Sequence, residues 1–160
     1  MNTIMMKRIL LVASHLLVGG IGFALGIYAL PILTQPQSPG MHEVQSVTNN
    51  ALYTGTFQRD RQDSDFLHWG EGSVSISDDH IGFVGKLAPG PDYKLYLSPQ
   101  FIETEQAFLQ NKHTMVQIGD VKTFDRFSLP IPESVETANY NTVIVWCETF
   151  GQFITSARYK

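Results

Sequence analysis

A long uncharged apolar run near the N-terminus most constrains what this chain can fold into. The segment Ile9–Leu33, ILLVASHLLVGGIGFALGIYALPIL, contains no charged residue. A helix needs roughly 20 apolar residues to cross a bilayer, whereas a cleavable signal peptide has a core of roughly 7 to 15. The sequence therefore predicts a transmembrane anchor over residues 9–33. A cleaved signal is the alternative, because Ala24-Leu-Gly26 has the small-x-small pattern of a cleavage site.

The charges around this run indicate its orientation. Lys7 and Arg8 precede it, the next basic residue is Arg59, and all 15 acidic residues follow it. Because basic flanks are retained on the cytoplasmic side, residues 1–8 are predicted to be cytoplasmic. The rest of the chain is then expected on the extracytoplasmic side of the cell membrane, periplasmic or extracellular, as a single-pass protein. The formal net charge of -4 repels phosphate backbones, which argues against a nucleic acid partner.

The spacing of glycines within the run bears on self-association. Gly22 and Gly26 are separated as in the small-xxx-small pattern that lets two membrane helices approach closely. A homodimer through this face is one expectation. The other is an ordinary membrane helix, in which glycine is common.

The remaining chain divides into a linker and one folded domain. Residues 34–50 contain Pro36 and Pro39, no aromatic residue and no periodicity, so they are predicted to form a semi-extended linker. Residues 51–160 consist of short strand-like runs separated by turns rich in Gly, Pro, Asp and Asn. Only Pro99–Asn111 has helical spacing. The prediction is an all-β domain, an antiparallel β-sandwich or barrel of about eight strands with one short helix.

The cysteine content limits the redox chemistry. With Cys147 as the single cysteine there is no internal disulfide, no Cys-x-x-Cys pair and no covalently attached c-type haem. Cys147 ends the apolar run TVIVWC, where strand alternation points its sulfur to one side and Trp146 to the other. Since both sides are apolar, this run is predicted to be a central strand covered on both faces. Cys147 is then either a small buried hydrophobe or a redox-active thiol.

Patterns for metal ligands are weak. The histidines stand apart from one another, and Asp60, Asp63 and Asp65 lack the spacing of a calcium loop, so the sequence predicts no metal site. His68 is more distinctive because Trp69 and two glycines follow it. It either bonds to the backbone as a structural residue or lines a pocket.

Two blocks in the folded part carry a specific pattern. One is Ala88-Pro-Gly-Pro-Asp92 leading into Leu95-Tyr-Leu-Ser98, and the other is Tyr140-Asn-Thr-Val-Ile-Val-Trp-Cys147. Together with glycines around residues 55–72, they resemble the DM13 domain family over about residues 52–159.

The resemblance implies both a fold and a chemistry. DM13 domains look like β-sandwich modules related to DOMON domains and are proposed to act in electron transfer, with the residue matching Cys147 as the redox group. A redox partner protein follows from that role. DOMON relatives bind haem or sugars, so haem is raised as a cofactor, and His68 and Met115 would be its ligands.

A second hypothesis is a non-catalytic binding module displayed on a membrane tether. Trp69, Tyr93, Tyr96 and Tyr140 would offer an aromatic surface for a glycan or a partner protein, and Trp146 is a further candidate. Under neither hypothesis is a stand-alone enzyme expected. An accessible, reactive cysteine favours the redox role, and a buried, inert one favours binding.

Overall fold

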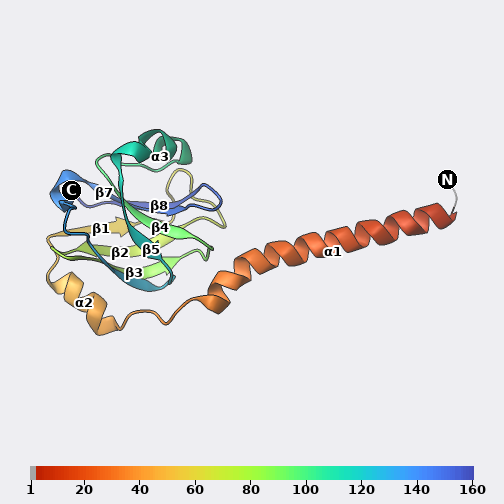
Figure 1. Cartoon of the computed structure of the whole chain (residues 1–160), viewed down its shortest axis with the longest axis horizontal. Helices are drawn as coiled ribbons and strands as arrows, with labels where there is room; N and C mark the ends of the chain where they lie inside the picture. The colour runs from red at the N-terminus through yellow and green to blue at the C-terminus, as the bar shows by residue number, and fades with distance from the viewer. Residues whose placement is uncertain (1–2) are drawn as a thin grey trace.

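A long helix leads into a domain built mainly of strands in the computed structural model, which describes residues 3–160 (Figure 1). The helices are α1 (Thr3–Thr34), α2 (Met41–Asn49) and α3 (Glu105–Asn111), with 3-10 turns at Lys112–Thr114 and Thr137–Asn139. The strands are β1 (Tyr53–Phe57), β2 (Gly70–Ile76), β3 (His80–Leu87), β4 (Tyr93–Ser98), β5 (Val116–Val121), β6 (Arg126–Pro130), β7 (Thr142–Cys147) and β8 (Gln152–Arg158).

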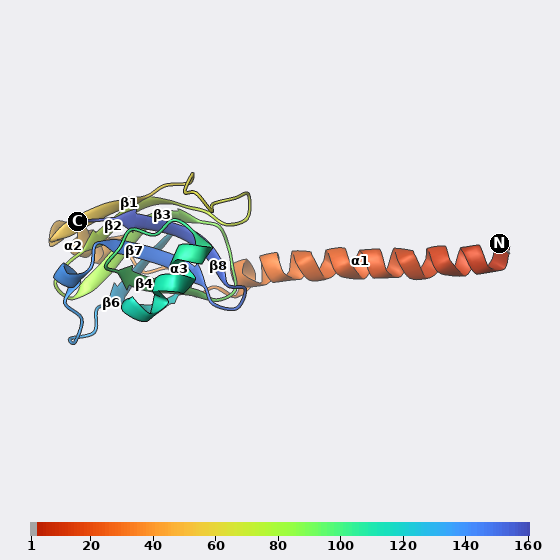
Figure 2. The same cartoon turned by 90° about the horizontal axis from the view of Figure 1, so that it is seen from above.

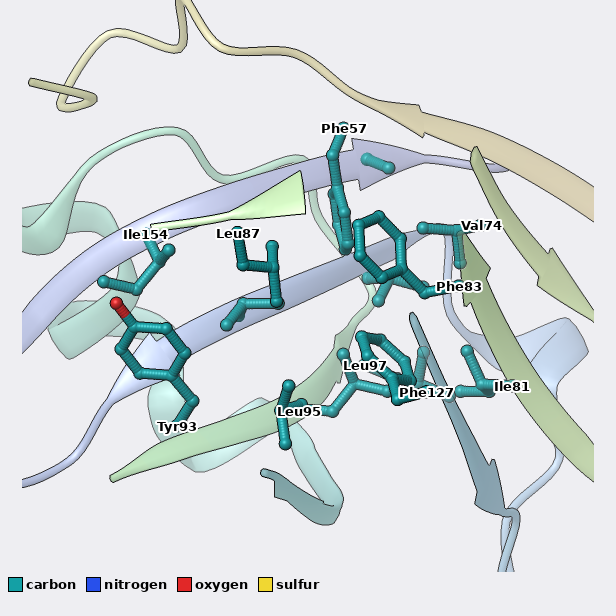
Figure 3. Close-up of a cluster of buried hydrophobic side chains, with 14 of the residues drawn as sticks. Phe57, Val74, Ile81, Phe83, Leu87, Tyr93, Leu95, Leu97, Phe127 and Ile154 are labelled. Carbon is teal, nitrogen blue, oxygen red and sulfur yellow. The ribbon is translucent and has the colours of Figure 1, made fainter. Parts of the chain in front are cut away.

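The strands form two four-stranded antiparallel sheets, in the orders β1-β2-β3-β6 and β5-β4-β7-β8. Side chains from both sheets meet in one buried cluster, so the sheets pack face to face. Phe83 of β3 lies at its centre, with ring centroids 5.3 Å from Phe57 and 5.1 Å from Phe127 (Figure 3). The predicted antiparallel architecture is confirmed.

Two facing glycines let β2 and β3 pair closely. Gly72 has a φ of +139°, and a Cβ there would lie 2.4 Å from the Val84 carbonyl oxygen. Gly85 is its partner in the register, and a Cβ at that position would lie 2.1 Å from the Glu71 carbonyl oxygen. A side chain at either position would push the two backbones apart.

The prediction of one short helix is wrong, because α2 forms within the segment expected to be a semi-extended linker. Val44 and Val47 are buried, three positions apart on one face of α2. They dock on β3 where Gly82 leaves room, since a Cβ at Gly82 would lie 3.1 Å from Val47. Two apolar residues are too weak a signal to reveal a helix until the surface that receives them is known.

Contacts with the β3-β6 side of the domain also fix the stretch before α2. The Arg126 Nε–H donates to the Pro39 carbonyl oxygen at 2.7 Å, and the Ser38 hydroxyl donates to the Asp125 carboxylate. The segment between α1 and α2 is therefore attached to the domain and holds it close to the end of α1.

The outer face of the β5-β4-β7-β8 sheet is covered by α3. Phe108 of α3 stacks on Trp146 of β7, with ring centroids 4.0 Å apart and an interplanar angle of 9°. Every residue of β7 is buried. The predicted central strand covered on both faces is thus confirmed.

Over most of its length α1 extends away from the sandwich (Figure 2). It is long and apolar enough to cross a membrane, a criterion that an N-terminal signal sequence also meets. Gly22 and Gly26 have no neighbouring atoms within 4 Å of an added Cβ. Only the C-terminal part of α1 approaches the domain.

Candidate functional site

Cys147 and Tyr93 lie opposite each other at the end of the sandwich nearest α1. They are cross-strand partners, at the end of β7 and the start of β4. Each is only 3% exposed, and both belong to the core between the sheets. Cys147 is therefore a buried thiol, and its chemistry depends on the space beside it.

An apolar cavity of about 470 Å³ separates this end of the sandwich from α1. Its walls combine α1 with loops at the end of the sandwich: Ala24, Leu25, Ile27, Tyr28, Phe66, Leu67, His68, Pro89, Gly90, Pro91, Tyr93, Cys147, Phe150 and Ile154. Small-molecule sites commonly enclose roughly 300–1,000 Å³, so the cavity is large enough to admit a ligand beside the sulfur.

The surroundings of Cys147 favour its neutral thiol. Burial raises the pKa of the thiol, and the Asp92 carboxylate adds to this effect. The backbone N–H groups of Phe150, Asp92 and Thr149 act in the opposite sense but do not outweigh burial. Since the thiolate is the nucleophile, Cys147 needs a base or an oxidant in the cavity in order to react.

His68 is oriented by a turn that Asp65 stabilises. One Asp65 carboxylate oxygen accepts from the backbone N–H groups of Leu67 and His68 at 2.6 and 2.8 Å, and the other lies 2.9 Å from His68 Nδ1. Burial acts to raise the pKa of Asp65, but these hydrogen bonds outweigh it and hold the pKa below its usual range. Because a carboxylate only accepts, His68 Nδ1 carries the proton, which leaves Nε2 as an acceptor in the neutral ring.

Tyr93, which is buried over most of its surface, brings its hydroxyl to the same cavity. Burial raises its pKa, and no hydrogen bond from residues 3–160 contributes to that shift. A Cβ at Gly90, which also lines the cavity, would lie 2.5 Å from the hydroxyl oxygen. Figure 3 shows the same oxygen beside Ile154, another residue of the cavity wall. The ring tip of Tyr93 thus lies at the wall as a hydrogen-bond donor.

The comparisons with known proteins agree with the sequence pattern. The family model described as "Electron transfer DM13" matches residues 57–159. The chain belongs to the DM13 family. Neither a curated protein nor a solved structure matches it. The matched range contains every β-strand from the end of β1 onward, together with Asp65, His68, Tyr93 and Cys147.

The two residues predicted as haem ligands are not brought together in this DM13 domain. His68 lines the cavity beside Cys147, whereas Met115 packs against the cluster beneath α3, on the other face of the sheet. Axial ligands of one haem iron must face each other across the macrocycle. The His68 and Met115 pair therefore does not fit haem.

In the acidic loop of the DM13 domain, Asp63 and Asp65 accept hydrogen bonds that stabilise the local backbone. The Asp63 carboxylate accepts from the Glu105 backbone N–H at 2.7 Å, at the start of α3, and Asp65 holds the turn before His68. Among residues 3–160, no group of three His, Cys, Asp or Glu side chains is arranged to hold a metal ion.

The predicted aromatic residues do not gather on one surface. Tyr93 is buried between the sheets, while Tyr96 and Trp146 are buried under α3. Trp69 is half-buried with the Arg59 guanidinium 3.6 Å above its ring, and Tyr140 packs against the inter-sheet core. Rings buried on different faces offer no common platform for a sugar.

The sequence gives little indication of the cavity itself. Three of its walls come from segments far apart in the chain: α1, the Phe66–His68 loop and the turn after β7. The available signal was the Asp65-x-x-His68 spacing, which is typical of a turn closed by an aspartate side chain. That spacing predicts an oriented histidine but not what the histidine faces.

Proposed function

We propose that this DM13 protein is a membrane-tethered redox module, with α1 as the retained anchor and the sandwich on the extracytoplasmic side. The basic flank formed by Lys7 and Arg8 supports that orientation. The family match supports a role in electron transfer. Cys147 is the group we assign to exchange electrons.

One observation carries the assignment: the single thiol of the chain lines an apolar cavity at the end of the sandwich next to α1. Cys147 and a thiol of a partner protein would join in a disulfide, and the two electrons and two protons released would reduce a two-electron acceptor. The second thiol must come from outside, since the chain has one cysteine. His68 lines the same cavity, and its Nε2, the ring nitrogen that Asp65 does not contact, would accept the proton of Cys147.

The test is thiol trapping in intact cells that express the full chain. A small membrane-impermeant thiol reagent should label Cys147 without lysis, and non-reducing gels should show a reductant-sensitive adduct of Cys147 with a second protein. Because Cys147 is buried and its pKa is raised, labelling should be at least about tenfold slower than at an exposed thiol.

A matched control is the double variant Cys147→Ser, Thr149→Cys, which moves the thiol two residues along to an exposed position of the same turn. This variant reports on which side of the membrane the turn lies, and because its thiol is exposed it should be labelled rapidly. If the control labels while Cys147 stays fully reduced and reacts only after denaturation, the redox role is wrong and a tethered binding module is the better account.

A further inference from the structure

Large apolar side chains protrude from the domain beside the mouth of the cavity. Phe66 is 87% exposed, Leu67 48% and Phe150 51%, and all three contribute to the cavity wall. Phe66 and Leu67 share the loop before β2 and Phe150 lies in the turn after β7, and the two loops meet at the α1 end of the sandwich. Clustered exposed apolar residues mark a contact with another apolar phase, and beside a membrane helix that phase is lipid.

The connection between α1 and the domain keeps this end close to the bilayer. Only residues 35–40 separate α1 from α2, and six residues span at most roughly 20 Å. The hydrogen bond from Arg126 to the Pro39 carbonyl oxygen further limits how far the domain can lie from the end of α1. Ala24 and Tyr28, which line the cavity, precede the predicted outer end of the span at Leu33. The mouth of the cavity therefore lies near the outer surface of the membrane, with the exposed Asp65 carboxylate in an adjoining loop.

The interior of the cavity combines apolar walls with two polar groups. The Tyr93 hydroxyl is a donor without a partner among residues 3–160, in a side chain that is 3% exposed. Because this hydroxyl makes no hydrogen bond within the domain, it is free to donate to a ligand in the cavity. His68 also lines the cavity, and its Nε2 is the ring nitrogen that Asp65 leaves free to accept a hydrogen bond. A ligand that fits is apolar and membrane-soluble, and carries a carbonyl or hydroxyl oxygen.

We propose that the cavity between α1 and the Cys147 end of the sandwich binds the ring of a membrane-soluble quinone, which enters from the outer leaflet. This inference rests on the proposed redox role and names its electron acceptor. Oxidation of Cys147 and one partner thiol to a disulfide yields two electrons and two protons, and these convert one quinone to its quinol. Tyr93 would donate to a ring carbonyl, and His68 would accept from the quinol hydroxyl.

The test uses the full chain in lipid nanodiscs, titrated with decylubiquinone, whose fully substituted ring does not add to thiols. Bound quinone should slow the alkylation of Cys147 by N-ethylmaleimide at least about tenfold, because it fills the space beside the sulfur. Tyr93→Phe should weaken decylubiquinone binding about fivefold, which corresponds to roughly 1 kcal/mol for one hydrogen bond.

Tyr159→Phe is the matched control. Tyr159 is also a buried tyrosine, but its hydroxyl donates to the Thr137 carbonyl oxygen at 2.9 Å, away from the cavity. This variant should bind decylubiquinone as the wild type does. Dodecanoate, which has a chain but no ring, should not protect Cys147.

Equal protection by dodecanoate would overturn the proposal, because the cavity would then be an acyl-chain site. Absence of protection by decylubiquinone, or equal binding by the wild type and Tyr93→Phe, would also overturn it. Failure of the redox role is distinguishable: decylubiquinone would still protect Cys147 in nanodiscs, while Cys147 would remain reduced in cells.

Discussion

Lys112 Nζ lies 2.7 and 2.8 Å from the two carboxylate oxygens of Glu148, on the face of β7 opposite the Cys147 sulfur. The Tyr96 hydroxyl donates to the same carboxylate. Strand alternation thus places the Glu148 carboxylate and the Cys147 sulfur on opposite faces, and Lys112 balances the charge of Glu148. The pKa of the Cys147 thiol is raised mainly by burial. The carboxylate that adds to this effect is that of Asp92, which immediately precedes β4.

The first prediction concerns the pH dependence of stability. Burial raises the pKa of Cys147 in the folded protein, so the unfolded chain loses the thiol proton first as pH increases. The contribution of Cys147 to stability is therefore complete below the ordinary thiol pKa of about 8.5 and is lost as pH rises toward the folded value. From this group the free energy of unfolding should fall between pH 7.5 and pH 9.5 by at most about 1.4 kcal/mol, the limit for a thiol that stays protonated in the folded protein.

Urea unfolding of the full chain in detergent, followed by tryptophan fluorescence, measures this loss. Cys147→Ala should abolish that part of the alkaline decline while the remainder persists. An unchanged pH profile in Cys147→Ala would show that the thiol ionises as readily in the folded protein as in the unfolded chain.

The second prediction concerns the Lys112 and Glu148 pair. Burial acts to raise the pKa of Glu148, but hydrogen bonds from Lys112 and Tyr96 outweigh it, so the net pKa is lowered. This stabilisation is present above the ordinary carboxyl pKa and is lost as pH falls through the folded value. Lys112→Met should cost about 0.5–1 kcal/mol at pH 7, and the difference from the wild type should shrink as pH falls below the ordinary carboxyl pKa.

Lys122→Met provides the comparison, because Lys122 is 67% exposed and lies 3.7 Å from Asp120. Its loss should cost at most about 0.2 kcal/mol at pH 7. Similar costs for the two variants would mean that the contact with Glu148 is no stronger than a solvated surface pair.

The sequence predicts some of these features and misses others for physical reasons. Alternation in TVIVWC correctly places Cys147 and Trp146 on opposite faces, because a period of two leaves no freedom once the run is a strand. The cavity was not predictable in this way. It forms where α1 packs against loops from both sheets, and no local sequence pattern predicts contacts between segments so far apart in the chain. Likewise, the composition that made Tyr93 and Tyr96 candidates for a binding surface does not reveal that both faces of β4 are covered.

The third prediction tests whether α2 is part of the domain. Val44→Ala removes two buried methyl groups from the contact with β3, and at about 0.8 kcal/mol for each it should lower the free energy of unfolding by about 1–2 kcal/mol. Gln45→Ala changes an exposed position of the same helix and should stay within about 0.5 kcal/mol of the wild type. If both variants match the wild type, α2 is a tether and not a structural element of the domain.

The fourth prediction concerns the stacked pair beneath α3. Trp146→Ala should cost about 3–5 kcal/mol, because the ring is fully buried and its partner Phe108 cannot fill the space. Leu109→Ala, one residue along α3 and 61% exposed, should cost less than about 0.5 kcal/mol. A double-mutant cycle between Phe108→Leu and Trp146→Phe should give a coupling of about 0.5–1.5 kcal/mol for the stacked rings.

The same pair separates stability from reactivity at the thiol. Phe108 and Trp146 pack on the face of β7 opposite the sulfur, so Phe108→Leu should destabilise the domain without changing the native alkylation rate of Cys147. The measurement is the rate constant with N-ethylmaleimide without denaturant, compared with the global unfolding constant of each variant, because a rate that does not follow that constant reports the folded state. A faster reaction in Phe108→Leu would show that the two faces of β7 open together, and that access to Cys147 depends on α3 as well as on the cavity beside α1.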